Sequence, residues 1–235
     1  MWHKHKVSVA LIMKDNAATI REVVEEIFYT GFVDEVLCID LGSSDRTISE
    51  LSYTRARVLS AKSYPEAFAF AFERSDGNIL IFADPDGFIP GTEISNLLPY
   101  SMTYNAVFVS RISWLGSSIV SHDMKYSKLN KKFGNIISRR FDTVDVTDIN
   151  ASLFLFNKNV IDFKDVHFEL GDEFFVFEVM MASILLGLSH VQVPVQFHSD
   201  LKVTDAVLFD SLSNRFRLYK KLGGVAKSVD RRSDR

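Results

Sequence analysis

A chain of 235 residues with 47% hydrophobic residues can bury a sizeable core, as one domain or as one domain with an added lobe. Its net charge of −3 gives no reason to expect nucleic acid as a partner. Cys38 is the only cysteine, which excludes an internal disulfide and is typical of a reducing compartment. There is no run of about 18 apolar residues, and residues 1–16 turn polar too soon for a signal peptide. We therefore expect a cytoplasmic protein whose contact with a membrane, if any, is peripheral and on its inner face.

The first half of the chain alternates strand and helix patterns. Residues 6–13 form a near-continuous apolar run, which predicts a strand buried on both faces of a parallel sheet. Apolar residues then recur at helical spacing over 20–28, with Asn16 placed as an N-cap and Gly31 at the helix end. Further strands are predicted over 34–40, 56–61, 78–84 and 105–114. Further helices are predicted after Asp45, which would cap the first of them, over 65–77, where Gly77 would end the helix, and over 91–100. This order indicates an α/β fold with an open, mainly parallel sheet and helices on both faces.

The pattern changes after about Trp114. Residues 115–145 are polar and basic. Beyond them, a strand is predicted over 151–161, a strongly apolar helix over 173–188 and a strand over 189–197. We expect a single domain over 1–212, divided into two halves after residue 114, and a basic, partly flexible tail over 213–235.

Two carboxylates, Asp84 and Asp86, stand where an apolar run stops. One interpretation is a turn, because Asp, Pro and Gly are turn residues. The other is a metal site, because residues two apart in an extended segment point the same way and could converge on one cation. Ligands of open α/β sheets bind beyond the carboxyl ends of the strands, where Asp15 and Asp40 are also expected. Hard oxygen ligands favour Mg²⁺ or Mn²⁺, with water and a substrate diphosphate completing the coordination.

The segments SVALIMKDNAATI, DEVLCIDLGSSDRT and GNILIFADPDGFIPG together carry a resemblance. In order and spacing they resemble the family-2 glycosyltransferases of GT-A fold. The pattern of that family is a strand ending in Tyr/Lys-Asn-Glu, a strand ending in Asp-Asp-x-Ser-x-Asp-x-Thr and a strand ending in Asp-x-Asp. Downstream, VSRISWLG, DVTDINASLFLF and FFVFEVMMASILLGLSHVQVPVQF resemble the polyprenyl (dolichyl)-phosphate mannosyl- and glucosyltransferase branch. The resemblance extends to about residue 205 and implies a Rossmann-like sheet with an acceptor-side extension.

The resemblance implies metal-dependent transfer of a hexose from a nucleotide-diphospho sugar. Residues 1–114 would bind this donor and residues 115–212 the acceptor. The donor-side residues implied are Asp40 for the nucleotide base or ribose, and Asp84 and Asp86 for the metal and diphosphate. Asp15, after the first strand, is a further candidate for substrate binding, and His198 is either a partly buried histidine or a third metal ligand. The acceptor-side residues implied are Arg111, which would face the phosphates or the acceptor, and Asp148 and Glu178, which would line the acceptor.

The need for a catalytic base depends on the acceptor. Transfer with inversion to a sugar hydroxyl needs a carboxylate to take the proton, and Asp172 and Glu173 are the candidates, with Glu178 nearby in the sequence. Glu178 would be costly to bury without a partner, which suggests that it faces a site or pairs with a basic residue. A polyprenyl phosphate acceptor is already anionic and needs no base.

Basic residues mixed with aromatic and aliphatic ones occur in residues 115–145 and in the tail. Lys128 belongs to a lysine cluster that is either a solvated helix face or a docking patch for an acceptor phosphate or lipid headgroups. Such segments suit the surface of an anionic membrane, and binding there would be peripheral and weakened by salt.

Two departures from the family pattern favour an alternative function. Leu41 replaces the second acid of the Asp-Asp pair, and Phe88 stands where the lipid-phosphate branch often has a glutamine. Both favour a non-catalytic GT-A-like protein that binds nucleotide or lipid and transfers nothing. A nucleotidyltransferase of similar sheet order would instead need a glycine-rich loop after the first strand, and residues 13–19 contain no glycine.

Overall fold

The computed structural model describes residues 2–87, 89–110, 132, 134–139, 141–143, 146–149, 153–161, 163, 168 and 175–195. The chain divides into two compact units, Met1–Ser199 and Asp200–Arg235, and every described residue belongs to the first. The expected domain boundary at residue 212 and the basic tail therefore lie outside the described residues. No helix in the described part of the chain is long and apolar enough to cross a membrane.

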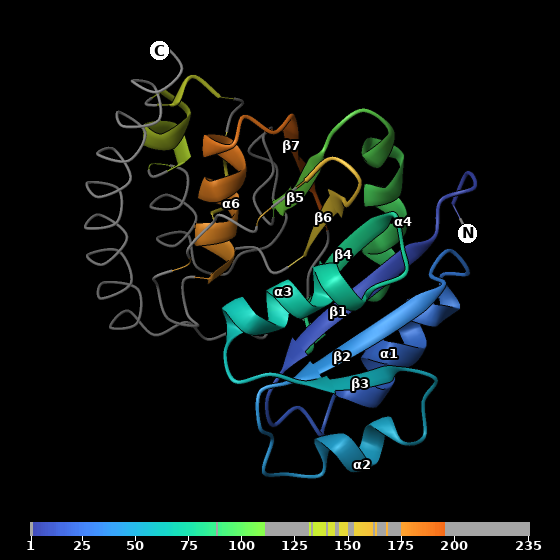
Figure 1. The fold of residues 1–235 in the computed structure, drawn as a ribbon. Helices are drawn as coiled ribbons and strands as arrows, with labels where there is room; N and C mark the ends of the chain where they lie inside the picture. Colours follow the sequence, from blue (N-terminus) through green and yellow to red (C-terminus); the bar gives the residue numbers. More distant parts are fainter. Residues whose placement is uncertain are drawn as a thin grey trace. The chain divides into compact units, whose positions relative to one another are not determined.

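A seven-stranded sheet organises the described residues in the order β3-β2-β1-β4-β6-β5-β7 (Figure 1). The strands are β1 (Val7–Met13), β2 (Glu35–Asp40), β3 (Arg57–Ser60), β4 (Ile79–Ala83), β5 (Ala106–Ser110), β6 (Phe154–Asn157) and β7 (His190–Pro194). Neighbouring strands are parallel except where β6 pairs with β4 and β5. The predicted α/β fold with a mainly parallel sheet is confirmed.

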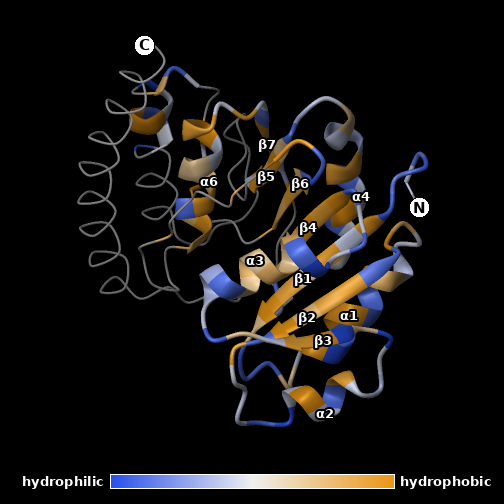
Figure 2. Cartoon of the chain, in the orientation of Figure 1, coloured by the Kyte–Doolittle hydropathy of each residue, from blue (hydrophilic) through white to orange (hydrophobic). Residues whose placement is uncertain are grey.

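The strand β1 lies at the centre of the first-half strands, and all seven of its residues are buried. Ala10 is paired with Leu37 of β2 on one side and with Phe82 of β4 on the other. Figure 2 shows β1, β2 and β4 as hydrophobic over most of their length. A strand covered on both faces can be apolar at every position, which is why the sequence shows a continuous run instead of an alternation.

Helices cover both faces of the sheet, with α3 on one face and α1 on the other (Figure 1). The helices are α1 (Ile20–Tyr29), α2 (Thr47–Leu51), α3 (Tyr64–Arg74), α4 (Ile94–Leu97) between the 3-10 turns η1 (Gly91–Glu93) and η2 (Leu98–Met102), and α6 (Phe175–Leu185). Ser63 caps α3 by accepting a hydrogen bond from the N–H of Glu66, and a proline lies in the first turn. Gly31 follows α1 with a φ of 73°, as expected for a glycine at a helix end.

Two predicted helix ends were wrong. The N-cap of α1 is Thr19, and Asn16 stands further upstream, where its carbonyl accepts the N–H groups of Thr19 and Ile20. The helix α3 ends at Arg74, so Gly77 is not its terminal residue. Gly77 instead packs against β1, where an added Cβ would lie 2.6 Å from the backbone nitrogen of Ser8. Its lack of a side chain permits this close approach of two backbones.

Aromatic residues fill the space between α3, α6 and the sheet. The ring of Phe68 in α3 stacks on Phe82 of β4 with centroids 4.8 Å apart, and it meets Phe175 of α6 edge-on at 5.3 Å. The rings in contact within this cluster are Phe68, Phe72, Phe82, Phe108, Phe154, Phe156, Phe163, Phe168 and Phe175. Offset and edge-on pairs of this kind add to the free energy gained from burial.

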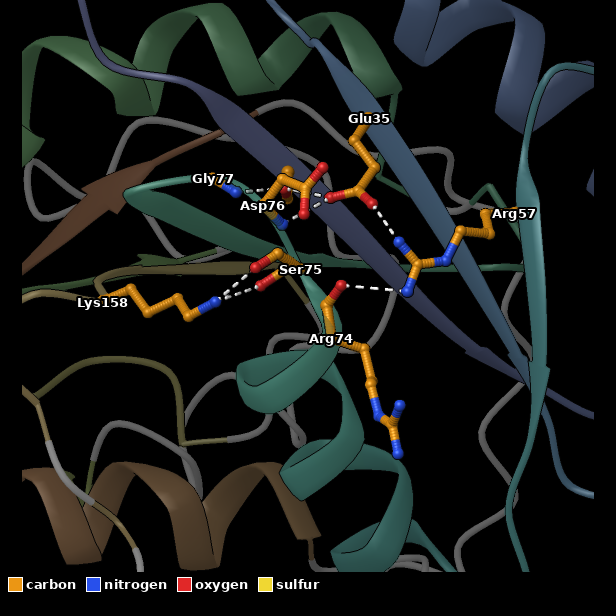
Figure 3. Close-up of polar contacts among 8 residues, drawn as sticks. Glu35, Arg57, Arg74, Ser75, Asp76, Gly77 and Lys158 are labelled. Atoms are coloured by element: carbon orange, nitrogen blue, oxygen red, sulfur yellow. Dashed lines mark hydrogen bonds and ion pairs between the residues drawn. The ribbon is translucent and has the colours of Figure 1, made fainter.

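A polar network joins the amino ends of β1, β2 and β4 (Figure 3). One oxygen of Glu35 pairs with Arg57 at 2.9 Å, and the other accepts hydrogen bonds from the hydroxyl of Ser8 and the N–H of Asp76. The second guanidinium nitrogen of Arg57 donates to the carbonyl of Arg74 at 3.0 Å. This network fixes the segment that leaves α3 and enters β4.

Lys158, which follows β6, attaches to the same segment. Its ammonium group donates to the carbonyl and the hydroxyl of Ser75, at 2.5 and 3.0 Å (Figure 3). Burial lowers the pKa of Lys158, although the charges of Glu35 and Asp76 act in the opposite direction. The turn after β6 is therefore tied to the end of α3.

Candidate functional site

The carboxyl ends of β1, β2 and β4 lie side by side at one edge of the sheet, because the three strands are parallel neighbours. Met13 at the end of β1 is in register with Asp40 at the end of β2. Three loops leave this edge, which we call the first loop (residues 14–19), the second loop (residues 41–46) and the third loop (residues 84–90). They carry three of the predicted site residues, Asp15, Asp84 and Asp86, and a fourth, Asp40, ends β2 directly before the second loop.

The first and second loops are joined by hydrogen bonds to a carboxylate from each loop, Asp15 from the first and Asp45 from the second. The N–H of Asp15 donates to the hydroxyl of Ser43 at 2.9 Å. The Oδ1 atom of Asp15 accepts the N–H groups of Ser44 at 2.6 Å and Asp45 at 3.2 Å. In return, Oδ2 of Asp45 accepts the N–H of Ala17 at 3.1 Å. Asp15 is exposed and adopts a φ of 56°, so the contacts with the second loop hold it in a left-handed conformation that is uncommon for a non-glycine residue.

Asp40 is only 7% exposed and organises the start of the second loop. Its carboxylate accepts the N–H of Gly42 at 3.1 Å and both the N–H and the hydroxyl of Ser43, at 3.1 and 2.5 Å. Gly42 has a φ of 87°, which favours glycine at this position. The hydroxyl of Ser43 thus connects Asp40 to the first loop.

The N-cap of α2 is Arg46, so the capping position predicted for Asp45 was one residue too early, although the side chain of Asp45 still binds the first residue of the helix. Its Oδ1 atom accepts the N–H of Thr47 at 2.9 Å and the hydroxyl of Thr47 at 2.5 Å. The hydrogen bond from this hydroxyl lowers the pKa of the Asp45 carboxyl. Both carboxylate oxygens of Asp45 are therefore used, Oδ1 at the start of α2 and Oδ2 at the first loop.

The third loop is a turn. β4 ends at Ala83, and Asp84 accepts the N–H of Asp86 on its Oδ1 atom at 3.0 Å and the N–H of Gly87 on its carbonyl at 3.3 Å. The expectation that Asp84 and Asp86 share a direction by strand alternation was therefore wrong, because neither lies in the extended segment. Asp84 is 7% exposed and Asp86 is exposed.

Two side chains of the first loop reach the third loop. The Nδ2 atom of Asn16 donates to Oδ1 of Asp86 at 2.5 Å, and the hydroxyl of Thr19 donates to the carbonyl of Pro85 at 3.0 Å. Sequence reasoning missed Asn16 and Ser43 as site residues. Ser43 occupies the serine of the Asp-Asp-x-Ser-x-Asp-x-Thr pattern, which was a signal for it, whereas the link from Asn16 to Asp86 spans 70 residues.

The family model for glycosyl transferase family 2 matches residues 8–163, which include all three loops. The chain belongs to this family. Solved structures with a similar fold include glucosyl-3-phosphoglycerate synthase from Mycobacterium tuberculosis with UDP, at 18% identity and a TM-score of 0.67 over 87% of this chain and 75% of that chain. The same enzyme with Mn²⁺, UDP and glucosyl-3-phosphoglycerate has 17% identity and a TM-score of 0.66 over 89% and 75%. The structure of that enzyme with Mg²⁺ and UDP has 18% identity and a TM-score of 0.65 over 89% of this chain and 74% of that chain.

These structures confirm the predicted GT-A type of sheet for this member of glycosyl transferase family 2. At such identities the likeness concerns the fold. No curated protein sequence matches the chain.

The third loop of this glycosyl transferase family 2 chain has donor atoms suited to a hard divalent cation. Mg²⁺ is usually held by one or two carboxylates together with water and substrate phosphates, and Asp84 and Asp86 supply two carboxylates. No group of three or more His, Cys, Asp or Glu that could hold a metal occurs among the described residues. Cys38 is an unsuitable ligand, because burial inside β2 raises the pKa of its thiol to about 12. A cation here would take its other ligands from water, from substrate or from residues outside the described part.

The residues predicted to lie on an acceptor side are only partly described. Asp148 is fully buried, and its backbone is held by Gln192 of β7, whose side chain accepts the N–H and donates to the carbonyl of Asp148 at 3.2 and 2.5 Å. The same oxygen of Gln192 accepts the N–H of Thr147 at 2.6 Å. Glu178 is buried in α6. The predicted residues Arg111, Lys128, Asp172, Glu173 and His198 lie outside the described residues.

Proposed function

We propose that the protein is a metal-dependent glycosyltransferase that moves a hexose from a nucleotide-diphospho sugar to an acceptor. The observation that supports this proposal is that hydrogen bonds join three loops at the carboxyl edge of the sheet, among them bonds to Asp40 and Asp86, in a chain of glycosyl transferase family 2. In the M. tuberculosis enzyme of similar fold, the structures contain UDP with Mn²⁺ or Mg²⁺. The arrangement also agrees with the rule that open α/β sheets bind ligands at this edge.

Asp84 and Asp86 would hold Mg²⁺ or Mn²⁺, with His198 as the candidate third ligand. The ion would supply neutralisation of the charge that develops on the diphosphate leaving group. Asp40 would lie beside the nucleotide and shape its pocket through the second loop. We assign Asp15 a supporting role in substrate binding, because its Oδ1 atom already accepts two N–H groups of the second loop.

We propose a phosphorylated acceptor. The M. tuberculosis structures include complexes with phosphoglyceric acid beside UDP-glucose and Mn²⁺, and the lipid-phosphate branch that the sequence resembles also uses an anionic acceptor. A polyprenyl phosphate is our preferred acceptor because of the basic and aromatic composition of residues 115–145 and 213–235. Arg111, Lys128 and the segment around Asp148 would serve the acceptor. With a hydroxyl acceptor instead, Asp172, Glu173 or Glu178 would be needed as a base.

Isothermal titration calorimetry with UDP and GDP, with and without Mn²⁺, tests the proposal. We expect binding of one nucleotide that strengthens at least tenfold with the metal, and slow hydrolysis of the matching nucleotide sugar. Metal-independent binding without hydrolysis would support the alternative, a non-catalytic nucleotide- or lipid-binding protein. The half-buried Leu41 favours this alternative, because it replaces the second acid of the family's Asp-Asp pair.

A further inference from the structure

We infer that Asn16 is a positioning residue for Asp86, and that it fixes the carboxylate which the metal requires. This inference rests on the proposed function and names a residue that acts on the metal through another side chain. The hydrogen bond between Asn16 Nδ2 and Asp86 Oδ1 is 2.5 Å long. It joins the first loop to the third loop, and Asn16 is itself only 7% exposed.

The chemistry of both neighbours fixes the orientation of the Asn16 amide. Its Oδ1 atom accepts the N–H of Lys14 at 2.8 Å, which only an oxygen can do. Its Nδ2 atom therefore faces Asp86, where a carboxylate can only accept. An amide turned by 180° would place oxygen against oxygen at Asp86 and nitrogen against an N–H at Lys14.

Asp86 needs such a partner because it lies exposed on a turn. An exposed carboxylate samples several rotamers, and a metal ligand must be held in one of them. The amide of Asn16 occupies Oδ1 and leaves Oδ2 directed elsewhere; no hydrogen bond to Oδ2 occurs within the described residues. A neutral donor also adds no positive charge that would repel the metal ion. Hydrogen-bond partners of ligating carboxylates commonly change metal affinity by about 10–100-fold.

The hydrogen bond between Thr19 and Pro85 supplies a matched control. It joins the same two loops, at 3.0 Å, but it reaches a backbone carbonyl and not a ligand carboxylate. Thr19→Val removes this hydrogen bond with little change of shape. A role of Asn16 in loop structure alone would make Asn16→Ala and Thr19→Val behave alike.

The experiment measures Mn²⁺ affinity of the UDP-loaded protein by calorimetry, and UDP affinity without metal, for the wild type, Asn16→Ala and Thr19→Val. We expect Asn16→Ala to weaken Mn²⁺ binding about 10–100-fold while metal-free UDP affinity changes less than about twofold. Thr19→Val should leave both affinities within about twofold of the wild type. Equal Mn²⁺ affinities in the two variants would overturn the inference. A wild type that binds UDP without any metal dependence would instead overturn the proposed function.

A measurement on the wild type keeps the inference testable if Asn16→Ala does not fold. In protein with ¹⁵N-labelled asparagine, Mg²⁺ added with UDP should shift the side-chain amide resonance of Asn16. Asn96 is the internal reference, because its Nδ2 atom donates to Glu93 at 2.7 Å outside the three loops. An Asn16 amide that shifts no more than that of Asn96 while Mg²⁺ and UDP bind would contradict the positioning role.

Discussion

Asp15 and Asp40 are joined through one hydroxyl group. The hydroxyl of Ser43 accepts the N–H of Asp15 at 2.9 Å and donates to Oδ1 of Asp40 at 2.5 Å. Two residues that the sequence places at the ends of different strands thereby bind the same hydroxyl group, Asp40 through its hydrogen atom and Asp15 through a lone pair of its oxygen. The geometry of the second loop depends on this serine.

We expect Ser43→Ala to lower the free energy of unfolding by about 1 kcal/mol, because it removes a charge-assisted hydrogen bond and an acceptor for an exposed N–H. It should also weaken UDP binding by about tenfold, since the second loop, which we propose lies beside the nucleotide, loses a hydrogen bond that holds it. Chemical denaturation and calorimetry check the two effects. Ser44→Ala is the control, because the hydroxyl of Ser44 makes only a longer contact of 3.2 Å with Asp15. Similar losses of stability and UDP affinity in Ser43→Ala and Ser44→Ala would contradict a specific role of the Ser43 hydroxyl in holding the second loop.

Asp86→Ala should abolish metal-dependent nucleotide binding and leave the fold intact. Asp86 is exposed and accepts one side-chain hydrogen bond, so its loss should change the free energy of unfolding by less than about 1 kcal/mol. Calorimetry with UDP and Mn²⁺, beside a circular dichroism spectrum, provides the measurement. Asp76→Ala, at the opposite edge of the sheet, is the control for loss of an exposed carboxylate. A folded Asp86→Ala protein with unchanged Mn²⁺-dependent binding would show that the carboxylate is structural.

Leu41→Asp should tighten the binding of one nucleoside diphosphate relative to the others. Leu41 is half-buried at the end of β2, and its aliphatic side chain cannot accept an N–H from a nucleobase. An unpaired donor costs about 1–3 kcal/mol, which corresponds to roughly a 5- to 150-fold change in affinity. A panel of UDP, GDP, ADP and CDP measured by calorimetry would reveal the preference, with Leu41→Asn as the uncharged control. Unchanged affinities across the panel would place the base away from residue 41.

Gln192→Leu should destabilise the protein by about 2–4 kcal/mol. The side chain of Gln192 satisfies backbone groups of Thr147 and Asp148, both of which are buried, and each unpaired buried group costs about 1–3 kcal/mol. Gln192→Glu keeps the acceptor for the two N–H groups and loses the donor, so it separates the two contributions. Urea denaturation monitored by fluorescence measures both variants. Wild-type stability of Gln192→Leu would mean that water replaces the lost partners.

Sedimentation with anionic liposomes tests the acceptor proposal. We expect the protein to sediment at low salt and to be released near physiological salt, because each basic residue near the surface contributes about 1 kcal/mol that salt screens. Neutral liposomes are the control. Absence of sedimentation at every salt concentration would favour a water-soluble acceptor in place of a polyprenyl phosphate.

The strands of the first half could be predicted from the sequence because burial on both faces requires apolar residues in sequence, and such runs can be recognised locally. β1 and β4 are continuous apolar runs that end at polar residues, and Ser63 with Pro65 marks the start of α3. The direction of β6 could not be predicted. An antiparallel strand packed between parallel ones is also buried, so its composition resembles theirs. The direction of β6 depends on its partners β4 and β5, which lie about 75 and 50 residues earlier in the chain.

The carboxylates of the candidate site could be proposed from the sequence, whereas the hydrogen bonds that join its loops could not. Asp40 and Asp86 follow apolar runs, which is a local signal at a strand end. Asn16 carries no such signal, and its position before a helix favoured a capping role that the structure assigns to a different residue. The difference arises because a hydrogen bond between two loops depends on how neighbouring strands bring them together.

The placement of β6 makes residues 1–114 and the residues that follow them inseparable. β5 belongs to residues 1–114, yet its partners are β6 and β7, which both come from the second half. β6 also covers the side of β4 that a shortened chain would leave as a bare edge. Residues 1–114 expressed alone would thus carry an orphaned strand and an unprotected edge, a combination that promotes aggregation. A cut after residue 114 would separate β5 from both of its partners, so an exchange of function in this chain has to change loops on an intact sheet.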